Sequence, residues 1–313
     1  MKKKAIIISI KGFKLTSKEK LLLSNEKPWG LILFKRNIKS YNQIKILIQK
    51  IRQLTDKKFP ILIDEEGINV SRLGNIINHN FTANYFGKLY KISPQICIRI
   101  YKNYLDSICK KLKKIGININ TIPVLDVLRN NSSKVIGSRS FSDNKKIIKI
   151  LGKIATKQCA YNKIGNVIKH IPGHGCAISD SHLMMPKVNL SFSKLNNIDF
   201  FPFKLNSAKL AMTAHILYTK IDNHNVATFS EIVIKKIIRK KIRFKGILIS
   251  DDISMKALKY DLITNAKKSL DAGCNLILYC AGNINDNFKL IKSVPYIDKF
   301  TSKKTSEFYK FLR

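Results

Sequence analysis

Residues 246–252 read Gly-Ile-Leu-Ile-Ser-Asp-Asp, a short run of apolar residues that ends in two carboxylates. The apolar residues are contiguous rather than alternating with polar ones, which is typical of a parallel strand buried on both faces. Runs of the same kind recur along the chain. The eight candidate strands are Ala5–Ile10, Leu31–Phe34, Ile61–Ile63, Ile117–Val124, Asn166–Ile168, Leu210–Ala214, Gly246–Ile249 and Asn275–Tyr279.

Five of the stretches between these runs place apolar residues at i, i+3 and i+4, the spacing of an amphipathic helix. They are Ile44–Leu54, Cys97–Ile115, Ile147–Tyr161, Glu231–Ile242 and Ala266–Ala272. The alternation predicts an α/β fold, a single (β/α)8 TIM-type barrel that forms one catalytic domain over residues 1–313. A doubly wound open sheet is the rival fold, but no glycine-rich phosphate loop follows the first strand.

Four glycines stand where a predicted helix gives way to a strand. We expect each of them to end its helix at the C′ position, where glycine is favoured because it adopts a positive φ without strain. They are Gly116, Gly165, Gly246 and Gly273.

The composition is globular and strongly basic. Hydrophobic residues make up 45% of the 313 residues, which excludes a disordered chain, and 58 Lys and Arg against 20 Asp and Glu give a net charge of +38. The lysines run from Lys2 to Lys310 among Ile and Asn rather than gathering in one arm. This dispersal favours a chain-wide compositional bias with solvated charges, and no dedicated nucleic-acid partner is expected, although a basic surface attracts small anions.

The first residues resemble a signal peptide only briefly. Lys2, Lys3 and Lys4 precede the apolar run Ala5–Ile10, but that run is too short, Lys11 ends it and no small-residue cleavage site follows. We interpret it as a strand. No apolar run approaches the roughly 18 residues of a transmembrane helix, so we expect a cytoplasmic protein without a membrane segment. The six scattered cysteines form no CxxC motif and are expected to be buried free thiols.

Reactive side chains follow five of the candidate strands. These strand ends carry Asp64-Glu65-Glu66, Asp126, Lys169-His170, His215 and Asp251-Asp252. Because the carboxyl ends of barrel strands surround one opening, this repetition predicts an active site there. For Asp252 we expect a different role, as the cap of a helix over Ser254–Leu258.

The densest group of such residues is Lys169-His170-Ile171-Pro172-Gly173-His174-Gly175, followed by Ser179-Asp180-Ser181-His182. The proline and glycines prevent a helix, so His170 and His174 are not a helical metal-binding pair. Asp180 and His182 project to the same side of an extended chain. A carboxylate beside an imidazole fixes its tautomer and raises its basicity, which suits proton transfer near neutral pH.

These motifs resemble those of glycoside hydrolase family 3, and within it the bacterial β-N-acetylhexosaminidases of the NagZ type. The resemblance covers almost the whole chain, from residue 30 to residue 275. It is carried by residues 169–182 and 237–255, with support from residues 64–67, 123–126, 137–142 and 212–215.

The resemblance implies a retaining exo-β-N-acetylglucosaminidase that removes terminal β-1,4-linked N-acetylglucosamine from anhydro-muropeptides in peptidoglycan recycling. Asp251 would be the nucleophile, His182 the general acid and base, and Asp180 the residue that orients His182. The first sugar subsite would contain Asp64, Arg72, Arg139, Lys169 and His170. Asp126, Met212 and His215 would line or support the pocket. The enzyme would be a monomer that needs no cofactor and no metal, with a small carbohydrate as its only partner.

The chain departs from the family pattern at one place. Ile68 and Asn69 stand where the family usually has a second glycine and an arginine. The bulkier Ile68 could reshape the loop beneath the sugar, which affects affinity rather than chemistry.

Two alternatives from other functional classes stay open at this point. One is a non-enzymatic nucleic-acid or anion-binding protein on a decayed barrel, for which DNA binding would depend steeply on salt. The other is a metal-dependent barrel hydrolase, with ligands from His170, His174, His215 and Asp64.

Overall fold

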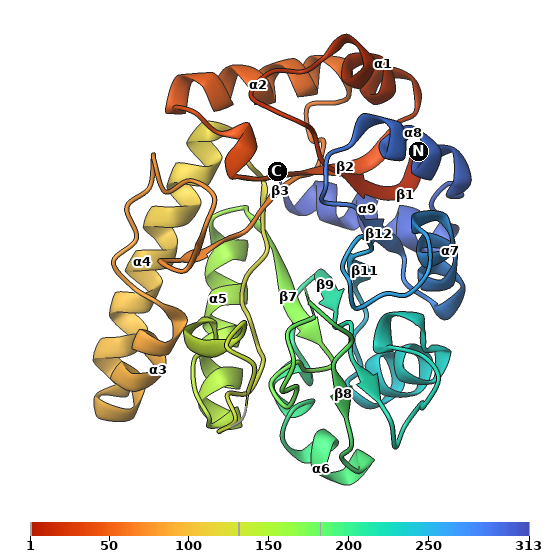
Figure 1. Ribbon diagram of the computed structural model, residues 1–313. Helices are drawn as coiled ribbons and strands as arrows, with labels where there is room; N and C mark the ends of the chain where they lie inside the picture. Colours follow the sequence, from red (N-terminus) through yellow and green to blue (C-terminus); the bar gives the residue numbers. More distant parts are fainter. Residues whose placement is uncertain (1, 131, 182, 313) are drawn as a thin grey trace.

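The computed structural model describes residues 2–130, 132–181 and 183–312. In this part of the chain, eight parallel strands close into a barrel in the order β1-β12-β11-β9-β7-β6-β3-β2 (Figure 1). The strands are β1 (Lys4–Ile8), β2 (Pro28–Leu33), β3 (Ile61–Ile63), β6 (Ile119–Asn120), β7 (Gly165–Ile171), β9 (Leu210–Thr213), β11 (Ile247–Asp252) and β12 (Leu276–Leu278). Each falls in one of the eight predicted strands or overlaps it, so the α/β barrel is confirmed.

Helices surround the strands (Figure 1). They are α1 (Ser17–Asn25), α2 (Tyr41–Leu54), α3 (Ala83–Ile92), α4 (Pro94–Ile115), α5 (Lys145–Tyr161), α6 (Phe192–Asn197), the π-helix η5 (Ile232–Lys241), α7 (Leu262–Ala272), α8 (Ile284–Ser293) and α9 (Lys299–Phe311), with the 3₁₀ turns η1 (Lys35–Asn37), η2 (Gly137–Arg139), η3 (Phe201–Phe203) and η4 (Ala227–Phe229). The five predicted helices correspond to α2, α4, α5, η5 and α7. Two further strand pairs lie outside the barrel: the hairpin β4 (Glu65–Gly67) with β5 (Val70–Ser71), and β8 (Lys187–Val188) with β10 (Leu217–Tyr218).

The strand β6 is much shorter than the predicted run Ile117–Val124. Pro123 has no N–H to donate to a neighbouring strand. Beyond Asn120 the chain stays beside β7 through single contacts: the Leu125 N–H donates to the Lys169 carbonyl at 2.7 Å, and the Lys169 N–H donates to the Pro123 carbonyl at 3.1 Å. The segment therefore reaches the same edge of the barrel without regular strand geometry.

Two of the four predicted helix-ending glycines have the expected conformation. Gly116 and Gly273 end α4 and α7 with φ of 104° and 114°. The prediction is wrong for Gly165 and Gly246, because the positive φ after α5 and η5 falls earlier, on Lys163 and Arg243. These glycines are required for space instead: a Cβ on Gly165 would lie 2.6 Å from the Phe308 ring, and one on Gly246 would lie 2.3 Å from the Lys209 carbonyl oxygen.

The amino-terminal end of the barrel interior is filled by α9. Phe308 of α9 packs in the same buried cluster as the inward-facing side chains of the strands, among them Ile7 and Trp29. The Trp29 indole N–H donates to the Thr305 hydroxyl at 2.8 Å, so the buried polar group is satisfied. A second and larger apolar cluster lies between the strands and the surrounding helices. The barrel interior is thus a packed core, and its carboxyl-terminal end is left for a site.

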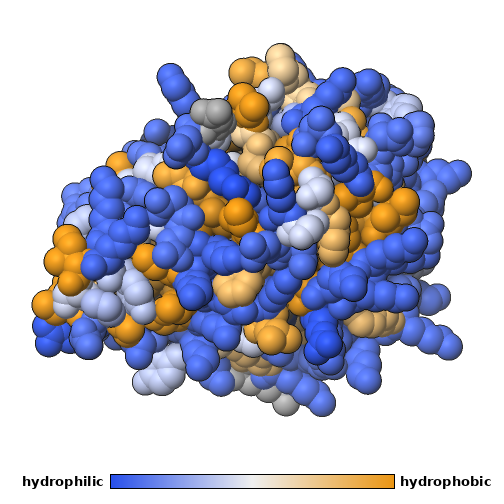
Figure 2. Space-filling model, turned by 90° about the horizontal axis from the view of Figure 1, so that it is seen from below, coloured by the Kyte–Doolittle hydropathy of each residue, from blue (hydrophilic) through white to orange (hydrophobic). Residues whose placement is uncertain are grey.

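The basic charge is distributed over the surface. Each α-helix, and η5, carries at least one exposed lysine, and among the described residues Lys3 and Lys169 alone of the lysines are buried. Figure 2 shows one face covered mainly by hydrophilic residues, with separate apolar areas between them. Of the helices in the described ranges, none has the length and apolar character to cross a membrane.

Candidate active site

A cavity of about 560 Å³ opens at the carboxyl ends of the barrel strands. Its walls come from the ends of β2, β3, β7, β9, β11 and β12 and from the loops that follow them. Several predicted site residues line it: Asp64, Arg72, Arg139, Lys169, His170, Met212 and Asp251. The barrel therefore brings together side chains that are up to 187 positions apart in the chain, from Asp64 to Asp251.

Asp251 presents a carboxylate to this cavity from the end of β11. Its Oδ1 accepts the Asp252 N–H at 2.8 Å, and its own N–H donates to the Thr213 hydroxyl at 3.3 Å. Burial by itself would raise the pKa of Asp251, but the electrostatic effect of the neighbouring His215, His170 and Lys169 side chains, together with the Asp252 N–H, outweighs burial and lowers that pKa. Asp251 is therefore an ionised carboxylate at neutral pH.

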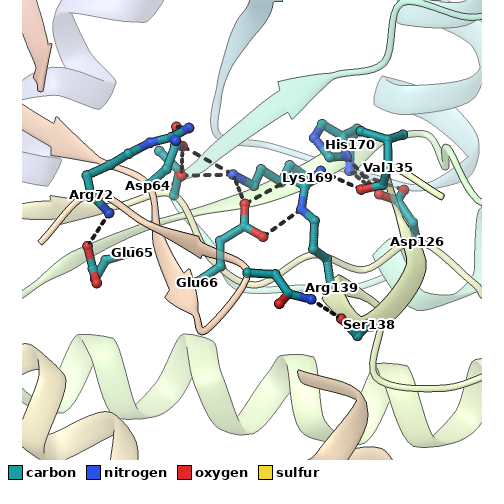
Figure 3. Close-up of polar contacts among 12 residues, drawn as sticks. Asp64, Glu65, Glu66, Arg72, Asp126, Val135, Ser138, Arg139, Lys169 and His170 are labelled. Carbon is teal, nitrogen blue, oxygen red and sulfur yellow. Dashed lines mark hydrogen bonds and ion pairs between the residues drawn. The ribbon is translucent and has the colours of Figure 1, made fainter. Parts of the chain in front are cut away.

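A network of ion pairs forms one wall of the cavity (Figure 3). The Asp64 carboxylate accepts from Arg72 Nη2 at 3.0 Å, from Lys169 Nζ at 3.3 Å and from the Thr121 hydroxyl. Burial would raise the pKa of Asp64, but the charges of Lys169 and Arg72 and the Thr121 hydrogen bond outweigh it, so that pKa is lowered. Asp64 accordingly remains charged and holds both cations toward the cavity.

Glu66 continues this network on the far side of Lys169 (Figure 3). It binds Lys169 Nζ at 2.6 Å and receives two parallel hydrogen bonds from Arg139, Nε at 2.8 Å and Nη2 at 2.9 Å. Burial opposes ionisation of Glu66, but the charges of Arg139 and Lys169 outweigh it and lower its pKa to about 2. Glu66 is not among the site residues predicted from the sequence. Its position two residues after Asp64 in an extended segment was the available signal, because alternate residues share one face.

Glu65, between them, points away from the cavity. Its buried carboxylate accepts the Arg72 and Leu73 N–H groups at 2.9 Å each and the Ser71 hydroxyl at 2.5 Å, and it pairs with His79. It thus fixes the β4–β5 hairpin, and with it the backbone from which Arg72 reaches Asp64.

Asp126 supports the cavity from behind rather than lining it. It is fully buried, and its Oδ1 accepts the His174 N–H at 2.6 Å while Oδ2 contacts His170 Nδ1 at 2.7 Å. Burial would raise its pKa, but His170 and His174 lower it, so Asp126 accepts from His170 as a carboxylate. His170 Nδ1 therefore carries a proton, and its Nε2 is left for the cavity side.

His215 also has a supporting position. It is fully buried, with Nδ1 2.7 Å from the Thr228 hydroxyl and Nε2 3.0 Å from the Asp252 carbonyl oxygen. Burial lowers its pKa more than the nearby Asp251 and Asp252 raise it. Through these two contacts His215 holds the backbone beside Asp251.

The loop with the predicted acid–base pair follows β7. His182 lies outside the described residues. Asp180 is half-buried, and its carbonyl accepts the N–H groups of Leu183 and Met184 at 3.0 Å each. Ser181, between the two predicted residues, lines the cavity, and its carbonyl accepts the Ala257 N–H at 3.2 Å. The loop is thus held against the cavity on the side of β11.

The prediction that Asp252 caps a helix is wrong. Residues 253–257 form turns and a bend, and α7 begins later, at Leu262, with Asp261 as its cap. The Asp252 carboxylate accepts the N–H groups of Ser254 and Cys280 at 3.1 Å each, so it ties the end of β11 to the end of β12. The Ala257 N–H bonds to the Ser181 carbonyl, which ties this segment to the loop that follows β7.

The described residues do not form the metal site of the alternative hypothesis, with ligands from His170, His174, His215 and Asp64. Across residues 2–130, 132–181 and 183–312, no three or more His, Cys, Asp or Glu side chains are grouped so as to hold a metal ion. His170 Nδ1 is engaged by Asp126, and both nitrogens of His215 have other partners. The six cysteines are free thiols; four are buried and two, Cys176 and Cys280, are half-buried.

A closed (β/α)8 barrel whose mouth holds ionised carboxylates among hydrogen-bond donors is the architecture of a barrel glycosidase. The family model described as the glycosyl hydrolase family 3 N-terminal domain matches residues 2–302. The chain belongs to this family, and it is a glycoside hydrolase.

Similar proteins have names that agree with the family. The chain is 32% identical to a β-hexosaminidase of Neisseria gonorrhoeae over 281 residues, which cover 88% of this chain and 77% of that protein. It is 34% identical to a β-hexosaminidase of Haemophilus ducreyi, over 88% of this chain and 80% of that one. The crystal structure of native NagZ from Neisseria gonorrhoeae superposes with a TM-score of 0.91 and 29% identity, over all of this chain and 90% of that chain.

Proposed function

We propose that this chain is a retaining exo-β-N-acetylglucosaminidase, a β-N-acetylhexosaminidase that hydrolyses terminal β-1,4-linked N-acetylglucosamine from anhydro-muropeptides during peptidoglycan recycling in the cytoplasm. The whole chain acts as one catalytic barrel. The observation that carries the proposal is the position of the Asp251 carboxylate, which faces a cavity whose opposite wall is the network of Asp64, Lys169 and Glu66. The names of its relatives support N-acetylglucosamine as the sugar that the enzyme releases.

In the first step, an Asp251 oxygen attacks the anomeric carbon while the bond to the leaving oxygen breaks. His182, oriented by Asp180, donates its proton to that oxygen. In the second step, His182 takes a proton from water, which attacks the same carbon and releases Asp251. The transition states carry positive charge on the sugar ring, and a fixed carboxylate stabilises that charge before it forms a bond.

The sugar itself is held by the network on the cavity wall. Asp64 accepts hydrogen bonds from sugar hydroxyls, while Arg72, Arg139, Lys169 and His170 donate to hydroxyl and acetamido oxygens. Because Lys169 and Arg139 are already fixed by Glu66, these donors lose little conformational freedom when the sugar binds.

The test uses the 4-nitrophenyl β-glycosides of N-acetylglucosamine and of glucose. We expect release of nitrophenol from the first and little from the second, with no effect of EDTA. Asp251→Asn should abolish turnover with the fold intact. His182→Ala should lower the rate by about 10²–10⁴-fold on a sugar leaving group and by less on nitrophenol, which needs little protonation. Turnover by Asp251→Asn at the wild-type rate would exclude Asp251 as the nucleophile, and equal losses on both leaving groups would exclude His182 as the acid.

A further inference from the structure

Among the described residues, five cationic side chains line the cavity: Arg36, Arg72, Lys134, Arg139 and Lys169. Three of them are bound by carboxylates of the cavity wall. Arg72 contacts Asp64, Arg139 contacts Glu66, and Lys169 contacts both. These charges are therefore largely neutralised before any ligand arrives.

A fourth cation, Arg36, is held by oxygen atoms of the barrel. It donates to the Ile10 carbonyl at 3.1 Å, to the Cys280 carbonyl at 2.5 Å and to the Ser9 hydroxyl at 2.6 Å. Lys134 differs from the other four. It is exposed, and within the described ranges its ammonium group makes no hydrogen bond or ion pair. Of the cations that the described part of the chain contributes to this cavity, it is the one left for a ligand.

The backbone around Lys134 is fixed on both sides. On one side, the Ser133 N–H donates to the Ala177 carbonyl at 2.9 Å, which ties the segment to the loop that leads to Asp180 and His182. On the other side, the Val135 carbonyl accepts Arg139 Nη1 at 3.0 Å (Figure 3). Lys134 consequently lies between the loop of the acid and a residue of the first sugar subsite.

This position indicates which part of the substrate Lys134 faces. A general acid must reach the leaving oxygen, so the leaving group lies on the side of the cavity where the acid's loop lies. The first sugar lies on the other side, over Asp64, Lys169 and Arg139. A side chain between the two is next to the leaving group rather than beneath the first sugar.

We propose that Lys134 binds the free carboxylate of a leaving-group sugar that carries no amide-linked peptide, and so gives the enzyme a preference for peptide-free acidic leaving groups. This inference rests on the proposed function and specifies the chemistry of its leaving group. Asp251 and Asp252 also line the cavity and repel an anion, and the free ammonium of Lys134 offsets that repulsion. Because the ammonium is solvated, it can bind a carboxylate with little desolvation cost.

The test compares two substrates with the same leaving oxygen. These are N-acetylglucosaminyl-β-1,4-anhydro-N-acetylmuramic acid as its free acid and as its carboxyl methyl ester, with released N-acetylglucosamine as the readout. The quantity measured is the ratio of kcat/KM for the acid to kcat/KM for the ester. We expect Lys134→Glu to lower this ratio about fivefold or more, the size of a well-placed exposed ion pair, and Lys134→Arg to preserve most of it.

A matched variant controls for the overall basic field. Lys50, an exposed residue of α2 that does not line the cavity, gives the same change of charge when replaced by Glu. Lys50→Glu should leave the ratio near the wild-type value. If Lys134→Glu and Lys50→Glu give the same ratio while both substrates are cleaved, the inference about Lys134 is wrong and the proposed function stands. If the wild-type enzyme cleaves neither substrate, the proposed function fails and the inference fails with it.

Discussion

Glu66 is the carboxylate whose removal should most disturb the cavity wall. It binds two cations at once, and the side chains involved are nearly buried: 7% of Glu66, 3% of Lys169 and 15% of Arg139 is exposed. Glu66→Ala leaves Arg139 with the Val135 carbonyl, and Lys169 with the Thr121 hydroxyl at 2.9 Å and a longer contact of 3.3 Å to Asp64. Two cations would then be buried with less compensation than before.

The size of the effect can be worked out in two ways. A pKa lowered from 4.5 to about 2 means that the folded state favours the Glu66 carboxylate by about 3 kcal/mol. Removal of one partner from a buried ion pair typically costs about 3–5 kcal/mol. We therefore expect Glu66→Ala to lower the free energy of unfolding by about 3–5 kcal/mol. Glu66→Gln, which keeps the volume but not the charge, should lower it by about 3 kcal/mol.

The assay is urea unfolding followed by circular dichroism at several pH values. Because the folded-state pKa of Glu66 lies below its ordinary value, its contribution is complete above about pH 4.5 and is lost as the pH falls toward 2. Glu66→Gln should lack that part of the acid sensitivity. Glu307→Gln removes a carboxylate from a partly exposed ion pair with Lys304, and it should change stability little at any pH.

Two results would refute this reasoning. One is a loss of less than about 1 kcal/mol in Glu66→Ala with an unchanged urea dependence, because the pair would then behave like a surface ion pair. The other is a stability of Glu66→Gln that falls with acid as steeply as that of the wild type.

Two further predictions concern the base of the loop after β7. A Cβ on Gly175 would lie 1.8 Å from the Val127 carbonyl oxygen, so Gly175→Ala should lower the free energy of unfolding by about 1–3 kcal/mol and reduce kcat. Gly12→Ala is the control, because a Cβ on Gly12 has no atom within 4 Å, and it should change neither urea unfolding nor turnover. Equal stability of the two variants would contradict the packing argument. Burial, aided by His170, lowers the pKa of His174 from 6.5 to about 4, so its neutral form stabilises the fold above about pH 6.5 and this contribution is lost as the pH falls toward 4. The free energy of unfolding of His174→Gln should therefore fall less than that of the wild type between pH 7 and pH 4, by about 3 kcal/mol. Parallel pH profiles of the two proteins would contradict the lowered pKa of His174.

The barrel could be predicted from the sequence because its signals are local. A run such as 247–249 is apolar at every position since both faces of a parallel strand are buried, and this requirement is visible without knowledge of the neighbours. The reactive residues at the strand ends, including Asp64, Lys169 and Asp251, were equally visible, because barrel geometry directs every strand end to one opening.

The tertiary structure alone decided which of those side chains face the cavity and which hold neighbouring residues in place. Asp126 and His215 follow their strands as Asp64 and Asp251 do, yet they turn inward and hold neighbours instead of facing the cavity. Glu66 forms ion pairs with Lys169 and Arg139, each of which is more than 70 positions away from it in the sequence. Such pairings depend on strand register and on the closure of the barrel, and these are set by packing between distant segments rather than by local propensity. The same holds for the ammonium of Lys134: that it has no partner among the described residues is a property of the assembled cavity, not of the residues beside it in the chain.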